Sequence, residues 1–298
     1  MNQASAAGVH WRRLAVALVV SALILVIELV AGFVSNSLAL LADAGHMFAD
    51  VVGMGLSLGA IAIASRPRAR GRTFGLYRLE ILAASLNAVI LLGIGILVLF
   101  EAVRRFAEPP EIGSTLVMAV AAIALVANAA SLRFLGHSGK ESLNLRAASV
   151  EVLGDLLGAA AVLVAGLVIW LTGWHQADAV ASIVIAVLIL PRAVTLLRDS
   201  VDVLMEATPK GVDMVEVERH ILEAPGVQGV HDLHAWTITS GVNVVSAHVV
   251  LVEGADPPAV LDHLCRCLQG DFDIDHSTFQ LETPDHVRWE AEGAMTQH

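Results

Sequence analysis

Six long apolar segments occupy the first two thirds of the chain. A transmembrane α-helix needs about 20 mostly apolar residues to cross the hydrocarbon core of a bilayer, and each segment is long enough. The pattern therefore predicts a polytopic α-helical membrane protein and argues against a soluble globule. The six spans are expected at residues 14–34, 38–64, 79–103, 112–135, 146–172 and 177–198.

The pattern changes near Met205, where shorter amphipathic and alternating stretches replace the continuous apolar runs. Ser240 and Gly241 separate two alternating runs and supply the turn chemistry of a hairpin. A helix-strand-strand-helix-strand order predicts a small α+β domain with its helices on one face of a sheet. These elements are expected at residues 212–223, 228–239, 242–252, 257–269 and 274–282.

Composition and charge divide the chain in the same way. It is 56% hydrophobic with a mean hydropathy of +0.71. Residues 201–298 nevertheless carry a net charge of −13, whereas residues 1–200 carry +2. The last third is thus expected to face water, and its acidity excludes nucleic-acid binding. We predict an N-terminal tail at 1–13, a six-helix membrane domain at 14–204 and a soluble domain at 205–298.

The basic residues between the predicted spans set the orientation. Ten lie in the N-terminal tail and in the loops after spans 2 and 4, and the opposite side has only Arg104 and Arg105. The positive-inside rule places both termini in the cytoplasm. The expected location of the chain is the inner (cytoplasmic) membrane of the cell. Cys265 and Cys267 would then be thiols in a reducing compartment. On a helix they point to different faces, and we interpret both as packing residues.

Two predicted spans each carry a pair of metal-ligand side chains one helical turn apart. His46 and Asp50 lie on the second span, and Glu151 and Asp155 on the fifth. Residues i and i+4 share a helix face, so each helix can offer two donors to one point. Four N/O donors suffice for a divalent-cation site, and ionisable groups at bilayer depth are functional by default. Asp43, three residues before His46, is expected to orient the His46 ring, and the alternative is a purely structural hydrogen bond.

The soluble domain holds a second possible ligand set. His231 and His248 fall on neighbouring strands and Glu282 ends the third, so the three could converge on one metal ion. The alternative is that acidic residues and histidines merely keep a water-exposed domain soluble. His234 is an odd interval from His231 and is expected on the opposite face. His263 is either a surface residue or an additional ligand. The histidines interpreted as solvated surface residues are His220, His276, His286 and His298.

Several long motifs stand in the order found in one known family. They are SNSLALLADAGHMFAD, RTFGLYRLEILAASLNA, LNLRAASVEVLGDLLG, and GVHDLHAWTITSG with SAHVV. The chain resembles the cation diffusion facilitator family of proton-coupled metal exporters, and is most similar to its bacterial zinc/cobalt/cadmium exporters. The resemblance implies a homodimer in the lipid bilayer, with six spans per protomer. It also implies a cytoplasmic metallochaperone-like, ferredoxin-like domain that binds metal and helps to dimerise the protein.

The resemblance also assigns individual residues. His46, Asp50 and Asp155 match transport-site ligands of the family, whereas Glu151 stands where zinc-type members usually place a histidine. A carboxylate in place of imidazole favours harder cations such as Mn²⁺, although the set can still bind Zn²⁺. The residues that match the metal-binding positions of the cytoplasmic domain are His231, His248 and Glu282.

The function implied is a divalent metal/proton antiporter that exports metal from the cytoplasm. Zn²⁺ is the expected transported and regulatory ion, with Co²⁺, Cd²⁺, Mn²⁺, Fe²⁺ or Ni²⁺ as alternatives. An intramembrane metalloenzyme is disfavoured, because hydrolytic zinc needs an open coordination position and the chain has no HExxH. A second alternative is a metal-responsive membrane sensor or scaffold with the soluble domain as its active part. Four ionisable ligands at bilayer depth argue against spans that serve only as an anchor.

Overall fold

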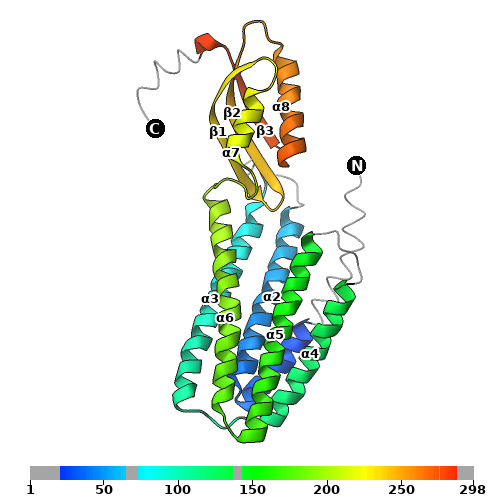
Figure 1. The fold of residues 1–298 in the computed structure, drawn as a ribbon, viewed down its shortest axis with the longest axis vertical. Coiled ribbons are helices and arrows are strands. Elements are labelled where there is room, and N and C mark those ends of the chain that lie inside the picture. The colour runs from blue at the N-terminus through cyan, green and yellow to red at the C-terminus, as the bar shows by residue number, and fades with distance from the viewer. Residues whose placement is uncertain (1–20, 65–72, 137–142, 275, 287–298) are drawn as a thin grey trace. The chain divides into compact units, whose positions relative to one another are not determined.

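The structure is a computed structural model that describes residues 21–64, 73–136, 143–274 and 276–286. The described residues form two compact units, one within residues 21–62 and 83–198 and the other within residues 63–82 and 199–286 (Figure 1). The first unit holds the apolar helices, and the second holds a small sheet with its covering helices.

The helices of the membrane domain coincide with the predicted spans. Their bounds are Ser21–Ser35, α2 (Leu38–Ala64), α3 (Arg78–Ala107), α4 (Ser114–Gly136), α5 (Leu143–Thr172) and α6 (Gln176–Leu204). Within the described residues, the four helices α3 to α6 are long and apolar enough to cross a membrane. The predicted helical membrane domain is therefore confirmed. Six as the number of spans stays a prediction, because part of the first lies outside the described residues.

Glycines let these helices pack closely. A Cβ at Gly45 of α2 would lie 2.8 Å from Cγ2 of Ile94 on α3, and a Cβ at Gly95 of α3 would lie 2.7 Å from Cδ2 of Leu190 on α6. Small residues at such contacts are typical of helix packing in membranes. Many large apolar side chains face outward, as a lipid solvent requires. Examples are Phe33, Leu97, Phe100, Val126 and Leu171.

A side chain from α6 caps the start of α2. Asp178 is buried, and its Oδ2 accepts a hydrogen bond from the Leu38 amide at 2.7 Å. Its Oδ1 accepts from the Ser37 hydroxyl at 2.5 Å and from the Ala39 amide at 3.4 Å. The first amides of a helix have no partner within the helix, and a negative charge there is favourable. Asp178 thus fixes the beginning of the helix that carries His46.

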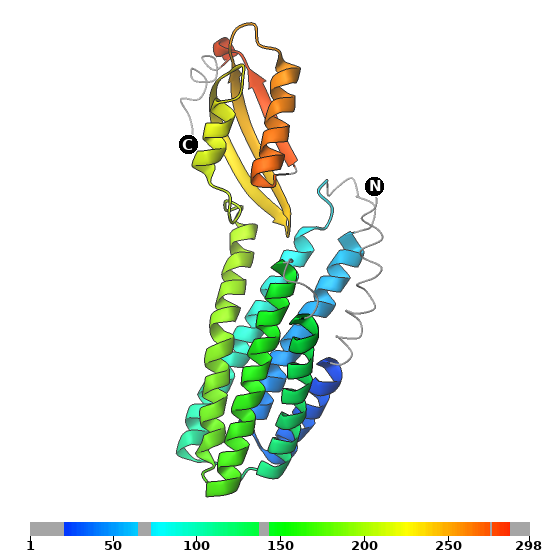
Figure 2. The same ribbon diagram turned by 45° about the vertical axis from the view of Figure 1, so that its right-hand side comes forward.

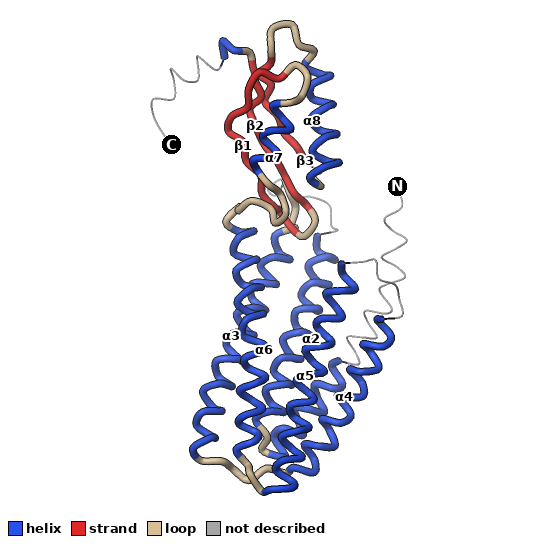
Figure 3. Tube along the Cα trace, in the orientation of Figure 1, coloured by secondary structure: helices blue, strands red, loops and turns tan. Residues whose placement is uncertain are grey.

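The second unit has the predicted α-β-β-α-β order, and the α+β class is confirmed. Its elements are α7 (Met214–Leu222), β1 (Val227–Thr239), β2 (Val242–Leu251), α8 (Pro257–Phe272) and β3 (His276–Glu282). The strands lie in the order β1-β2-β3 (Figure 3). Strand β2 pairs antiparallel with β1 and parallel with β3.

Both helices cover the same face of this sheet (Figure 2). Alternate residues of β2 point to that face, so they join the buried residues of the helices in one core. The opposite face carries His248. The core includes Val217, Ile221, Val245, Ala247, Val249, Val260, Leu264 and Leu268.

A bulge in β1 corrects one prediction. His231 pairs with His248 and His234 pairs with Ser246, so the register shifts between the two pairs. Asp232 lies in this interval with φ of 47°, a left-handed conformation that aspartate tolerates better than most residues. Directly paired residues share a face of the sheet. His231 and His234 therefore face the same side, and the prediction of opposite faces is wrong because strict alternation cannot anticipate the extra residue.

Candidate metal sites

Helices α2 and α5 bring three of the predicted ligands together. The Nε2 atom of His46 lies 3.5 Å from Oδ2 of Asp50 and 3.3 Å from Oδ1 of Asp155. His46 is only 7% exposed. The i,i+4 spacing places His46 and Asp50 on one face of α2, and Asp155 reaches them from α5. One nitrogen and two carboxylate oxygens thus converge within 4.8 Å of one another.

Buried polar groups flank these three ligand atoms. Nδ1 of His46 is buried and has no hydrogen-bond partner among the described residues, so Nε2 alone faces the two carboxylates. Asp43 is buried, and its Oδ1 occupies space left by Gly158 of α5, 3.0 Å from where a Cβ would lie. Its role in orienting His46 stays a prediction. Glu151 lies on α5 one turn before Asp155, but its side chain is outside the described residues.

The exposed face of the sheet gathers the second set. Nε2 of His231 lies 3.1 Å from Oε2 of Glu282, and Nδ1 of His248 lies 2.7 Å from Oε1 of the same carboxylate. The two rings meet edge to face, with centroids 5.0 Å apart. Glu282 is only 3% exposed, and Gln280 donates a hydrogen bond to its Oε1 at 2.7 Å. The three strands bring these residues together, and metal binding by them stays a prediction.

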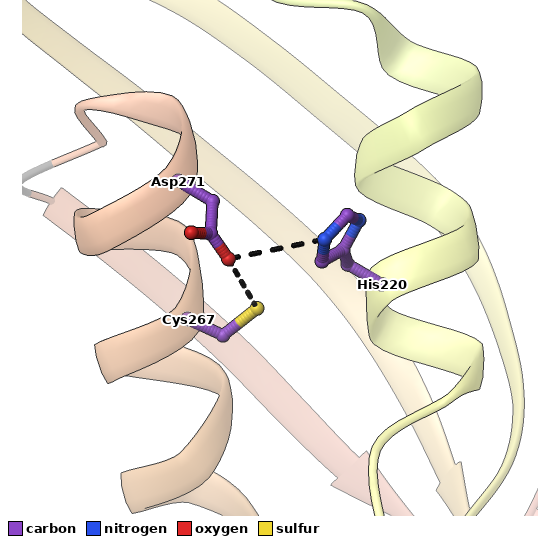
Figure 4. Close-up of side chains that lie close together, drawn as sticks. All are labelled: His220, Cys267 and Asp271. Atoms are coloured by element: carbon purple, nitrogen blue, oxygen red, sulfur yellow. Dashed lines mark hydrogen bonds and ion pairs between the residues drawn. The ribbon is translucent and has the colours of Figure 1, made fainter.

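A third group contains residues that the sequence pattern does not single out. His220 of α7 meets Cys267 and Asp271 of α8, and their ligand atoms lie within 4.8 Å of one another (Figure 4). The pattern suggests a solvated His220 and a packing Cys267. The sequence feature that could have indicated this group is the i,i+4 spacing of Cys267 and Asp271, which places a thiol and a carboxylate on one helix face.

The two cysteines point in different directions, as expected. Ser277 of β3 donates a hydrogen bond to Sγ of Cys265 at 3.3 Å, whereas Cys267 donates to Oδ2 of Asp271 at 3.6 Å. Burial, together with Asp271, raises the pKa of the Cys267 thiol. His263 is exposed on α8 and belongs to none of the three groups found in the described part of the chain.

Comparison with known proteins gives matches along nearly the whole chain. The cation efflux transmembrane domain matches residues 14–205, and the cytoplasmic domain of cation efflux proteins matches residues 209–284. The chain is 43% identical to the metal cation efflux system protein CzcD of Cupriavidus metallidurans over 276 residues, which are 92% of this chain and 87% of the relative.

Two other relatives are similar over comparable lengths. The zinc transporter ZitB of Escherichia coli is 41% identical over 273 residues, covering 91% of this chain and 87% of the relative. The cadmium, cobalt and zinc/H(+)-K(+) antiporter of Bacillus subtilis is 37% identical over 267 residues, covering 88% and 86%. A solved structure, the metal-bound C-terminal domain of the Cupriavidus CzcD transporter, is 46% identical with a TM-score of 0.23. It covers 24% of this chain and 99% of that domain.

Proposed function

We propose that this chain, which belongs to the cation efflux family of cation diffusion facilitators, exports divalent metal cations from the cytoplasm in exchange for protons. Members of this family are transporters, so the chain is a transporter and not an enzyme. It is a multi-pass membrane protein with a cytoplasmic C-terminal domain. Its relatives are named for efflux or antiport of zinc, cobalt and cadmium, which supports these metals as the substrates.

The convergence of His46, Asp50 and Asp155 between α2 and α5 carries the proposal. Ionisable groups at bilayer depth are costly and mark ion pathways. A nitrogen donor with carboxylate oxygens suits Zn²⁺ and its neighbours in the first transition row. We therefore assign the transport site to these three residues together with Glu151, which lies one turn from Asp155 on the same helix.

The geometry suggests how metal and protons exchange. Nε2 of His46 lies close to oxygens of both carboxylates, so a proton there can bridge to either of them when no metal is present. A metal ion needs the Nε2 lone pair and the deprotonated carboxylates. Arrival of metal from the cytoplasm must therefore expel the proton. On the outer side, protonation of the same atoms weakens coordination and releases the ion.

The cytoplasmic domain has a separate role in this proposal. His231, His248 and Glu282 hold a regulatory metal ion on the exposed sheet face, and binding there orders a homodimer. The buried Glu282 carboxylate, contacted by both rings, supports such a site. The excess of Lys and Arg in the tail and in the loops after spans 2 and 4 supports cytoplasmic termini. The similarity to bacterial efflux proteins supports a place in the inner membrane.

Transport in proteoliposomes tests the proposal. The chain is reconstituted inside-out with an internal pH dye, and Zn²⁺, Cd²⁺, Co²⁺ and Mn²⁺ are added outside in turn. Metal entry should raise the internal pH in the wild type, and Asp50→Asn or Asp155→Asn should abolish the change. Glu111→Gln, which alters an exposed acidic residue between α3 and α4, is the matched control and should behave as wild type. Wild-type exchange rates in both aspartate variants would refute the site assignment.

The same experiment distinguishes the proposed transporter from a second candidate function, that of a metal-responsive sensor or scaffold. The sheet-face group in the cytoplasmic domain is the observation that favours it. A sensor would bind metal in this domain while the reconstituted wild type moved neither metal nor protons. Metal-driven proton flux that needs Asp50 and Asp155 would exclude a sensor without transport.

A further inference from the structure

The helix-covered side of the cytoplasmic domain holds a group of side chains that the transport proposal does not use. His220 lies in the last turn of α7, and Cys267 and Asp271 lie in the last turns of α8 (Figure 4). The three predicted ligands His231, His248 and Glu282 belong to the opposite face of the sheet. The two groups are therefore separated by the thickness of the sheet and its core.

We infer that His220, Cys267 and Asp271 form a further metal site, which takes a borderline-soft divalent cation such as Zn²⁺, Co²⁺ or Cd²⁺. The donor set is one imidazole nitrogen, one thiolate sulfur and one carboxylate oxygen. Thiolate favours these metals over Mg²⁺ and Mn²⁺, which prefer oxygen ligands. Asp271 is largely exposed, so water can fill a fourth position and metal can enter from solvent.

Two of the three ligand-atom separations are close to those around a bound zinc ion, and all three ligand atoms lie within 4.8 Å of one another. Nε2 of His220 lies 3.8 Å from Oδ2 of Asp271, and Sγ of Cys267 lies 3.6 Å from the same oxygen. Ligand atoms around a tetrahedral zinc ion lie roughly 3.3–3.6 Å apart, given the usual zinc–ligand bond lengths. The thiol–carboxylate pair is already at this separation. The separation between Nε2 of His220 and Oδ2 of Asp271 reaches this range through a shift of a few tenths of an ångström.

The ring of His220 is already oriented for coordination. Its Nδ1 contacts the backbone carbonyl of Glu216 at 2.8 Å, and the carbonyl can only accept, so Nδ1 carries the proton in this contact. Nε2 of the neutral ring is then left as the acceptor that faces Asp271. Phe272 packs edge to face against the ring with centroids 5.0 Å apart, which further restricts its rotation. A backbone carbonyl on the far nitrogen is a common support for metal-bound histidine.

Local charge does not oppose a cation at this place. Arg219 precedes His220, but its guanidinium is engaged by Glu216 at 2.5 Å and Glu223 at 2.9 Å. The domain as a whole is strongly acidic. Binding converts the Cys267 thiol into thiolate, and the released proton passes to solvent. A metal ion here joins α7 to α8.

Cobalt absorption of the full-length protein tests the inference, because Cys265 and Cys267 are the only thiols in the chain. Sulfur coordination gives Co²⁺ a thiolate charge-transfer band, which neither the transport site nor the sheet-face group can produce. The wild type should develop the band, Cys267→Ser should lose it, and Cys265→Ser should keep it. His220→Gln and Asp271→Asn should each weaken the Co²⁺ affinity by more than the roughly 10–100-fold that is typical of losing a supporting contact.

Two results in the cobalt spectra would overturn the inference. One is a wild-type protein that shows no charge-transfer band at saturating Co²⁺. The other is a band that survives Cys267→Ser but disappears with Cys265→Ser. If Cys267→Ser does not fold, alkylation in the Cys265→Ser background replaces it. Zn²⁺ should protect Cys267 from iodoacetamide, and His220→Gln should abolish the protection; an equal alkylation rate with and without Zn²⁺ would refute the site. Neither readout depends on transport.

Discussion

At the scale of single residues, the donor at position 151 sets the metal preference that we expect. Replacing Glu151 by histidine exchanges an anionic oxygen for a borderline-soft nitrogen. We predict that Glu151→His raises the transport rate for Zn²⁺ relative to Mn²⁺ several-fold. Uptake of each metal into proteoliposomes, compared as a ratio, measures this change. Glu111→His is the matched control, and an unchanged ratio in Glu151→His would remove Glu151 from the transport site.

The thiol of Cys267 offers a second test at this scale. Burial and Asp271 raise its pKa, so at neutral pH the metal-free side chain is protonated. Only the thiolate reacts with iodoacetamide. Asp271→Asn removes a negative charge and should lower the thiol pKa, which speeds alkylation at neutral pH and moves the rate profile to lower pH. Mass spectrometry of Cys267 over a pH series measures the profile, and Asp262→Asn, an exposed acid on the same helix, should leave it unchanged.

At the scale of the elements, close packing of α2 against α3 positions the helix that carries His46. A methyl group at Gly45 would lie 2.8 Å from the branched carbon Cγ2 of Ile94, which cannot swing away without moving α3. We predict that Gly45→Ala destabilises the protein by about 1–3 kcal/mol, as overpacking usually does. Thermal unfolding in detergent would show this as a lower Tm. Gly55→Ala is the matched control, because a Cβ there meets nothing within 4 Å.

Sequence pattern predicts the elements well because each has a local cause. Apolar length marks the spans, and the turn at Ser240–Gly241, with φ of 74° at the glycine, marks the hairpin. The convergence of His231 and His248 also follows from pairing of neighbouring strands. The bulge at Asp232 could not be predicted from the sequence pattern. An extra residue in β1 interrupts the alternation of side-chain directions, and its position depends on how β1 pairs with β2. The His220 group could not be predicted either, because its members come from two helices whose contact depends on the core beneath them.

At the scale of the whole molecule, the charge is concentrated at one end of the chain. Residues 201–298 carry −13, so the cytoplasmic domain attracts divalent cations over distances set by the ionic strength. We predict that raising KCl increases the metal concentration needed for half-maximal transport from the cytoplasmic side. Flux titrations in proteoliposomes at low and high KCl measure the change. Sucrose at matched osmolarity should have no effect, and a salt-independent titration would contradict the prediction.

The bulge in β1 also determines where the strand tolerates a change in length. Asp232 and Leu233 together lie opposite Ala247, and Asp232 has the left-handed conformation, so we expect a deletion of Asp232 to leave the pairing of His231 with His248 and of His234 with Ser246 intact. A residue inserted at the same point cannot be accommodated without a change in the register of the strand. We expect the insertion to move the first half of β1 by one position and to turn His231 toward the helices. A deletion at Asp232 during evolution can therefore leave the ligand set in place. An insertion at the same point separates His231 from Glu282, although all the ligand residues are still present in the sequence.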